Sequence, residues 1–257
     1  MIKALCILSL MAGLTNAEIN RWSTLGAGLE SLQGTFDDGG QPVKFLLIRS
    51  DPLKIHVRII DTFHELGKGN SLGGFSVREV AKKTGALITV NAGSTASYTT
   101  PIAVGLLLIH GRIIHEVNSK ATNAGILCIT ADGVLIANVQ TFASHKCVDA
   151  VQRGPLLARP SAAAGQEKGD RYRRTVVAVD KSGKLLILIT SDKTTLAAVA
   201  AFLYTAHPEF GVQLGLNMDG DASSGLLTAG LGAVPLEIGS VDALVASAIG
   251  IYAKGTR

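Results

Sequence analysis

The chain has 257 residues, of which 47% are hydrophobic and 17% charged, with a formal net charge of +4 at pH 7. This length allows one sizeable hydrophobic core, and the apolar composition excludes a disordered chain. The mild positive charge occurs without basic clusters or interleaved aromatic residues, so the sequence gives no indication of nucleic-acid binding.

The N-terminal segment is typical of a secretory signal peptide. Lys3 precedes an apolar stretch from Ala4 to Leu14, and the small residues Thr15 and Ala17 occupy the positions expected of a cleavage site. The stretch is too short to cross a bilayer. We therefore expect residues 1–17 to be removed and residues 18–257 to form the mature domain. That domain should be exported, either periplasmic or secreted, without stable membrane insertion.

Most of the mature sequence predicts short β-strands joined by turns. Two β-rich runs flank Ser50-Asp51-Pro52. Hairpin turns are predicted at His110-Gly111, at Asp132-Gly133 and around Lys181-Ser182-Gly183. Several runs are continuously apolar, which indicates a sheet that is covered on both faces.

Two helices interrupt the strands. Ser76 and Glu79 have the spacing of a capping box that opens a short helix, and Gly85 can end it. Thr194 or Thr195 can cap a second helix that stops before Pro208. We expect an α+β fold, namely a single domain with a large mixed, hairpin-rich β-sheet and a few packed helices.

Two cysteines, Cys128 and Cys147, remain after removal of the signal peptide. In an oxidising compartment they could form a disulfide, and otherwise they would be buried thiols. The sequence leaves both alternatives open, because it does not show how far apart the two residues lie.

Polar residues gather where apolar runs begin or end, and these residues are the candidates for a functional site. They are Asn91 and Gly93, Gln152 and Gly154, Arg174, and then Asn217, Asp219, Gly220, Ser223 and Ser224. On local chemistry alone the last group, LNMDGDASSG, is typical of a polar turn. The histidines show no metal-ligand spacing, and the sequence has no P-loop or dinucleotide fingerprint, so we expect neither metal nor cofactor.

Taken in order, five segments resemble the phosphodiester glycosidase family. They are SVREVAKKTGALITVNAG, PIAVGLLLIHGRII, QRGPLL, RRTVVAVD and NMDGDASS, and SAIGIYAK is similar to the family's closing strand. The resemblance runs from about Gly28 to the C-terminus. It implies an exported hydrolase that cleaves a sugar-1-phosphodiester to a free sugar and a phosphomonoester, with a glycan or sugar phosphate as its substrate.

On the basis of this resemblance we hypothesise roles for the candidate residues. Asp219 would act as nucleophile or general base, Arg174 would hold the phosphate, and Asn91 and Gln152 would bond sugar or phosphate oxygens. Ser223 and Ser224 would orient Asp219 or donate to the phosphate. Gly93, Gly154, Asn217 and Gly220 would complete the substrate-binding surface. One carboxylate with a cationic clamp is chemically sufficient, because a phosphomonoester with a second pKa of about 6 leaves more readily than an alkoxide.

Two motifs depart from the family pattern. The family usually has Asn-Gly-Gly-aromatic where this chain has Asn91-Ala92-Gly93-Ser94-Thr95, and it has glycines where this chain has Asp221 and Ala222. A second carboxylate beside Asp219 could repel a phosphate. Two alternatives therefore stay open: a non-catalytic envelope or glycan-binding module on the same fold, and an exported hydrolase of another glycan or phosphodiester.

Overall fold

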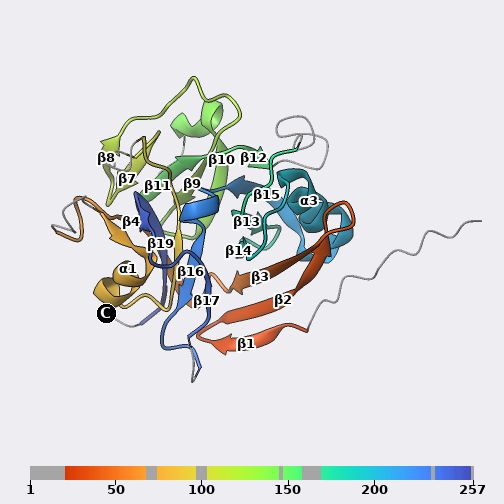
Figure 1. Cartoon of the computed structure of the whole chain (residues 1–257). Coiled ribbons are helices and arrows are strands. Elements are labelled where there is room, and N and C mark those ends of the chain that lie inside the picture. The colour runs from red at the N-terminus through yellow and green to blue at the C-terminus, as the bar shows by residue number, and fades with distance from the viewer. Residues whose placement is uncertain are drawn as a thin grey trace, which may run out of the picture.

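Three antiparallel sheets make up most of the molecule (Figure 1). The computed structural model describes residues 21–67, 74–96, 103–144, 147–157, 169–232 and 235–255. The expected signal peptide, residues 1–17, lies outside the described residues. The chain folds as a single, mostly β domain with few helices.

The strands are distributed over the three sheets and one short extra pair. The first sheet is ordered β1 (Ser23–Gly26), β2 (Leu29–Asp37), β3 (Pro42–Ser50), β14 (Leu185–Thr190), β13 (Thr175–Asp180), β15 (Val212–Asn217), β12 (Leu156–Leu157). The second is ordered β10 (Val134–Asn138), β9 (Gly125–Ile129), β11 (Asp149–Arg153), β7 (Leu107–Ile109), β8 (Arg112–His115). The third is ordered β17 (Glu237–Gly239), β16 (Gly225–Thr228), β6 (Ile88–Asn91), β19 (Ser247–Ala253), β4 (Ile55–Asp61). The extra pair is β18 (Leu244–Val245) with β5 (Phe75–Ser76).

The sheet arrangement corrects one expectation. In the described part of the chain every strand pair is antiparallel, so the prediction of one large mixed sheet is wrong in both number and direction. The strands that flank Ser50-Asp51-Pro52 illustrate the reason. Strand β3 already pairs with β2 on one side and β14 on the other, so β4 has no free edge to join and enters the third sheet.

The three predicted hairpins form where the turn residues indicated. His110 and Gly111 both have positive φ and connect β7 to β8, as a tight two-residue hairpin turn requires. The turns at Asp132-Gly133 and at Lys181-Ser182-Gly183 connect β9 to β10 and β13 to β14. The segment SAIGIYAK forms β19, as expected.

The three sheets pack around a common apolar core. Leu46 from the first sheet, Leu127 from the second and Ile59 from the third all lie in it with no exposed surface. Strands β13 and β14 are buried at every residue, because the core covers one face and a helix covers the other. These continuously apolar runs therefore form strands that are covered on both faces, as the sequence indicated.

Two helices cover the outer faces of the sheets (Figure 1). Helix α1 (Val77–Thr84) packs on the third sheet and has the predicted capping box and left-handed Gly85 end. Helix α3 (Leu196–Ala201) packs on the first sheet, and Thr195 caps it through a hydrogen bond from the Ala198 amide. A single π-type turn, Phe202–Ala206, continues α3 toward Pro208. No helix in the described ranges is long and apolar enough to span a bilayer.

The two cysteines of the mature chain are joined. Cys128 in β9 and Cys147, just before β11, form a disulfide with their Cα atoms 5.4 Å apart. Of the two alternatives left open by the sequence, the structure has the bond, which ties two neighbouring strands of the second sheet together.

Candidate active site

Strand ends from all three sheets meet at the polar segments. Strand β6 ends at Asn91, β11 ends at Arg153, and β15 leads directly into the loop that carries Asp219. The Asp219 amide donates to the Ala92 carbonyl at 3.0 Å. Arg153 reaches the Asp219 carboxylate from the second sheet. Segments more than sixty residues apart in sequence therefore converge on one place.

Asp219 and Arg153 form an ion pair at this junction. Arg153 donates from Nη2 to Asp219 Oδ1 at 2.9 Å. The Asp219 side chain is 17% exposed and that of Arg153 is 30% exposed, so both can be reached from solvent. An accessible carboxylate held beside a cation is suited to act as a nucleophile or as a general base.

A cavity of about 410 Å³ opens beside Arg153. This volume falls within the range typical of small-molecule sites. The cavity is lined by Val104, Gly105, Asn118, Lys120, Ala121, Thr122, Asn123, Ala124, Gln152, Arg153, Gly154 and Pro155. In the described part of the chain no group of three or more His, Cys, Asp or Glu side chains could hold a metal ion.

Asn91 anchors the loop that carries Asp219 by a side-chain hydrogen bond. Its Nδ2 donates to the main-chain carbonyl of Asp219 at 2.7 Å. Its Oδ1 accepts from Thr175 Oγ1 at 2.8 Å and from the Gly225 amide at 3.1 Å. Because Asn91 is fully buried and both lone pairs of its oxygen are used, it supports the loop and does not contact the cavity, contrary to the expectation that it would bond substrate oxygens.

The two serines of the loop have different surroundings. Ser224 is fully buried. Its Oγ lies 3.2 Å from Thr175 Oγ1, within hydrogen-bond distance, and donates to the Arg173 carbonyl at 3.2 Å. Ser224 therefore belongs to the support of the loop. No hydrogen bond of the Ser223 hydroxyl is found among the described residues, but the residue is only 3% exposed and does not line the cavity.

Gln152 shapes the wall of the cavity. Its Oε1 accepts from the amides of Leu106 and Asn118 at 3.0 and 2.8 Å, and its Nε2 donates to the Asn118 carbonyl at 2.8 Å. These bonds hold the segment before β7 and the segment after β8 against β11. Gln152 thus borders the cavity, but its amide oxygen and nitrogen both have protein partners, so its expected bonds to substrate oxygens stay a prediction.

The candidate glycines are explained by close packing. A Cβ atom on Gly93 would lie 2.8 Å from Ser247 Oγ, and one on Gly154 would lie 2.9 Å from the Ala124 Cα. A Cβ on Gly220 would lie 3.1 Å from the Arg173 carbonyl oxygen. These glycines allow the strand ends to approach one another, and only Gly154 lines the cavity.

Asn217 joins the loop to the segment after β11. Its Nδ2 donates to the Gly154 carbonyl at 3.3 Å, and its amide donates to the Pro155 carbonyl at 3.1 Å. Asn217 Oδ1 is buried and has no hydrogen-bond partner among the described residues. The side chain therefore keeps one acceptor unused next to the cavity wall.

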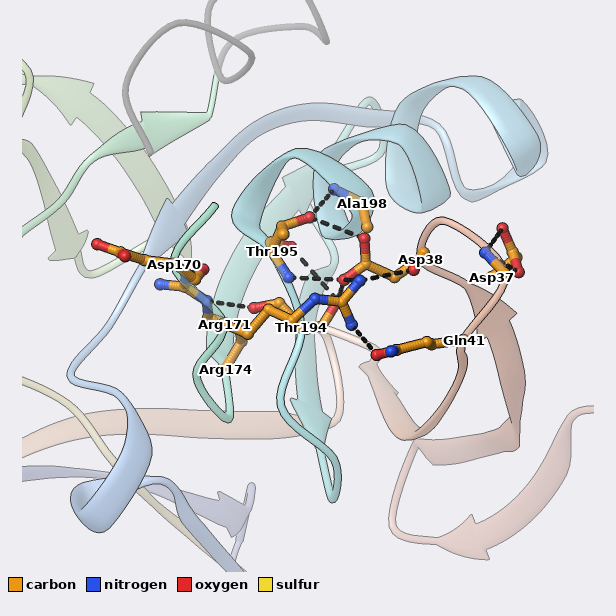
Figure 2. Close-up of polar contacts among 10 residues, drawn as sticks. Asp37, Asp38, Gln41, Asp170, Arg171, Arg174, Thr194, Thr195 and Ala198 are labelled. Atoms are coloured by element: carbon orange, nitrogen blue, oxygen red, sulfur yellow. Dashed lines mark hydrogen bonds and ion pairs between the residues drawn. The ribbon is translucent and has the colours of Figure 1, made fainter. Parts of the chain in front are cut away.

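Arg174 lies near Asp170 and Thr194 (Figure 2). Its Nε donates to the Thr194 carbonyl at 3.2 Å and its Nη2 to the Asp170 carbonyl at 3.1 Å, and the residue is only 3% exposed. Side chains alternate along a strand, so Arg174 shares the α3 face of the first sheet with Val176, whereas Thr175 faces Asn91.

Arg174, the expected phosphate-binding residue, is thus hydrogen-bonded to main-chain carbonyls. The cation that contacts Asp219 is Arg153, which lies in the segment QRGPLL but was not among the residues predicted from sequence. The available signal was the place of Arg153 at the end of β11, directly after the predicted residue Gln152. The phosphate-binding role expected of Arg174 therefore has no support from its position.

Asp221 has a positive φ and an ion pair with Lys193. Its φ is +52°, a conformation that glycine adopts readily and that Asp tolerates better than most residues. Its carboxylate lies 3.7 Å from Lys193 Nζ. The replacement of a family glycine by Asp221 thus keeps the backbone conformation and gives the second carboxylate a cation of its own.

Comparisons with known proteins identify the family and similar folds. A family model described as phosphodiester glycosidase matches residues 84–252. No curated protein matched the chain. A zebrafish structure, the catalytic domain of N-acetylglucosamine-1-phosphodiester alpha-N-acetylglucosaminidase auto-inhibited by its pro-peptide, is 20% identical. That match covers 92% of this chain and 88% of the other, with a TM-score of 0.65.

Two bacterial structures share the fold at lower identity. A protein from Burkholderia pseudomallei K96243 is 11% identical over 95% of this chain and 98% of its own, with a TM-score of 0.67. A hypothetical protein from Synechocystis is 14% identical over 88% of this chain and 62% of its own, with a TM-score of 0.56.

Proposed function

The chain belongs to the phosphodiester glycosidase family, and from this membership we propose that it is an exported hydrolase that cleaves a sugar-1-phosphodiester to a free sugar and a phosphomonoester. The observation that carries the proposal is the Asp219–Arg153 pair beside a ligand-sized cavity, built from segments that resemble the family's motifs.

Asp219 supplies the reactive carboxylate in this proposal. Either it attacks the anomeric carbon and forms a glycosyl-enzyme ester that water then cleaves, or it takes a proton from a water that attacks directly. In both routes the bond between the anomeric carbon and the phosphate oxygen breaks, and its electron pair leaves with the phosphate. The phosphomonoester needs little protonation to leave, since its second pKa is about 6. A second catalytic carboxylate is therefore not required.

Export is part of the proposal. Residues 1–17 have the pattern of a secretory signal peptide. The Cys128–Cys147 disulfide fits an oxidising compartment, where such bonds persist.

Purified residues 18–257 test the function directly. We expect release of free sugar and phosphomonoester in equal amounts from an N-acetylglucosamine-1-phosphodiester, the compound class in the name of the zebrafish relative. Asp219→Asn should lower kcat by a factor of about 10³ or more, because the amide is neither nucleophile nor base. Full turnover by that variant would remove Asp219 from the mechanism. Release of sugar without phosphomonoester from other glycans would favour the alternative hydrolase.

The non-catalytic alternative rests on the replaced glycines. Asp221 has a positive φ and pairs with Lys193, so its charge has a cation of its own. This arrangement favours the hydrolase over a glycan-binding module. Glycan binding without turnover in the same assay would reverse that preference.

A further inference from the structure

We propose that Arg153 is the anion-binding residue of the cavity. The phosphate of the substrate replaces Asp219 as the acceptor of the hydrogen bond from Arg153. The inference rests on the proposed function and specifies how its site recognises the substrate. In the structure Arg153 is paired with Asp219, and an anionic substrate releases that carboxylate for reaction.

The hydrogen-bonding capacity of Arg153 is largely unused. A guanidinium has five N–H donors, yet the described residues accept a side-chain hydrogen bond from Arg153 only at Asp219 Oδ1. Its Nε is buried and has no partner among them. A buried charged donor without an acceptor is costly, so a ligand that accepts at Nε completes the site. A phosphate does this well, because two of its oxygens match the guanidinium fork.

The lining of the cavity favours an anion. Arg153 and Lys120 are both among the lining residues, and no Asp or Glu is. The only carboxylate that contacts this lining through a described interaction is Asp219, and it does so through Arg153. A negatively charged group that enters the cavity therefore meets two cations and competes with Asp219 for one of them.

This competition links binding to reactivity. A carboxylate oxygen that accepts from Arg153 has a lone pair engaged, which makes it a weaker nucleophile and base than a free carboxylate. When a phosphodiester oxygen accepts from Arg153, Asp219 Oδ1 is released close to the bound sugar. A neutral glycoside has no charged acceptor of this kind, so Arg153 remains paired with Asp219. The pair thus selects for glycosides with a charged leaving group.

A matched substrate pair tests the selection. We would assay a glycosyl phosphodiester and a 4-nitrophenyl glycoside of the same sugar. Arg153→Met should lower kcat/KM on the phosphodiester by about 10²-fold or more, and on the neutral glycoside by much less. The kcat/KM of Arg153→Lys on the phosphodiester should lie between those of the wild type and Arg153→Met. Lysine keeps the positive charge but cannot donate two parallel hydrogen bonds as a guanidinium does. Arg49→Met is the control, since Arg49 forms a comparable partly exposed ion pair with Glu30 in the first sheet.

Phosphate binding gives a second readout that does not need turnover. Inorganic phosphate should bind the wild type, and Arg153→Met should weaken it by about tenfold or more. Asp219→Asn should tighten it by about tenfold, because the competing carboxylate is gone. That gain should disappear in the Arg153→Met, Asp219→Asn double variant.

The outcomes separate this inference from the proposed function. Equal losses on both substrates, or unchanged phosphate binding by Arg153→Met, would overturn the role of Arg153. If the wild type turned over neither substrate while phosphate binding followed the expected pattern, the proposed function would fail and the anion site would stand.

Discussion

The carboxamide of Asn91 and the main-chain carbonyl of Asp219 are joined by a 2.7 Å hydrogen bond between the end of β6 and the loop after β15. Thr175 in β13 donates to the oxygen of the same carboxamide at 2.8 Å. Through Asn91 the first and third sheets therefore set the position of the loop that carries the proposed catalytic carboxylate.

Removal of the Thr175 hydroxyl should loosen this loop. Thr175→Val keeps the side-chain shape in a fully buried position but leaves Asn91 Oδ1 with the Gly225 amide alone. We expect a loss of about 1–3 kcal/mol in unfolding free energy, the usual cost of a broken buried hydrogen bond. We also expect kcat to fall more than KM changes, because Thr175 acts on Asp219 and not on the substrate. Urea unfolding and steady-state kinetics measure the two effects.

Thr175→Ser is the matched control for that change. It retains the hydroxyl and removes one methyl group, so kcat should remain close to wild type while stability falls by about 1 kcal/mol. If the Val variant were as active as the Ser variant, the network would have no part in placing Asp219.

Asp221 should be replaceable by glycine. Its φ of +52° strains any residue with a Cβ atom, and its exposed contact with Lys193 at 3.7 Å contributes little. We expect Asp221→Gly to keep activity and to change stability by no more than about 1 kcal/mol, in the stabilising direction. Asp221→Ala keeps the strain of the positive φ and loses the contact with Lys193, so it should be the less stable of the two. Thermal unfolding of both variants side by side gives the comparison, and a large loss of activity in the glycine variant would give Asp221 a role in the reaction.

Features fixed by neighbouring residues could be predicted from the sequence. The capping box of Ser76 and Glu79 and the turn at His110-Gly111 need only a few adjacent side chains and a permissive backbone. The number of sheets could not be predicted in this way. It depends on which strands pair along each edge, and these strands can be far apart in sequence. Strand β3, for example, pairs with its neighbour β2 on one edge and with the distant β14 on the other.

The candidate site was predictable to a similar degree. Asn91 and Asp219 were expected to lie together, and they do. The structure pairs Asp219 with an arginine that was not predicted, because a sequence shows that an arginine is near a strand end but not which face of the sheet its side chain takes. Arg174 turns toward α3, where main-chain carbonyls use its donors, and Arg153 reaches Asp219 from another sheet.

The disulfide should make a measurable contribution to stability. Cys128 and Cys147 are separated by 19 positions, and a cross-link over a loop of this length stabilises by about 3 kcal/mol in the chain-entropy model. We expect the Cys128→Ala, Cys147→Ala double variant to lose about that amount. Dithiothreitol should lower the melting temperature of the wild type and leave that of the double variant unchanged. A wild type that is insensitive to reductant after confirmed loss of the bond would contradict the expected contribution.

Asp38 should make the stability of the first sheet and α3 dependent on pH (Figure 2). Its carboxylate accepts from the Thr195 amide and the Thr194 hydroxyl, both at 2.9 Å, and lies 3.3 Å from Arg171 Nη2. Burial raises the pKa of Asp38. The hydrogen bonds from Thr195 and Thr194 and the charge of Arg171 together lower it by more, so the net pKa is below its ordinary value of 3.8. A carboxyl with a lowered pKa in the folded state stabilises the protein above the pKa of the unfolded state, and this stabilisation is lost as the pH falls through the folded value.

Asp38→Asn tests this dependence. At pH 7 the variant should be less stable than the wild type by about 2 kcal/mol, because an amide cannot accept all the bonds that the carboxylate accepts. The difference should shrink as the pH falls below 3.8, where the wild-type carboxyl becomes protonated. Asp37→Asn is the control, since Asp37 is exposed and, among the described residues, its carboxylate accepts only from the nearby Gly40 amide. Urea unfolding from pH 7 to pH 3 measures the difference, and one that stayed constant over this range would show that the charge of Asp38 does not stabilise the fold.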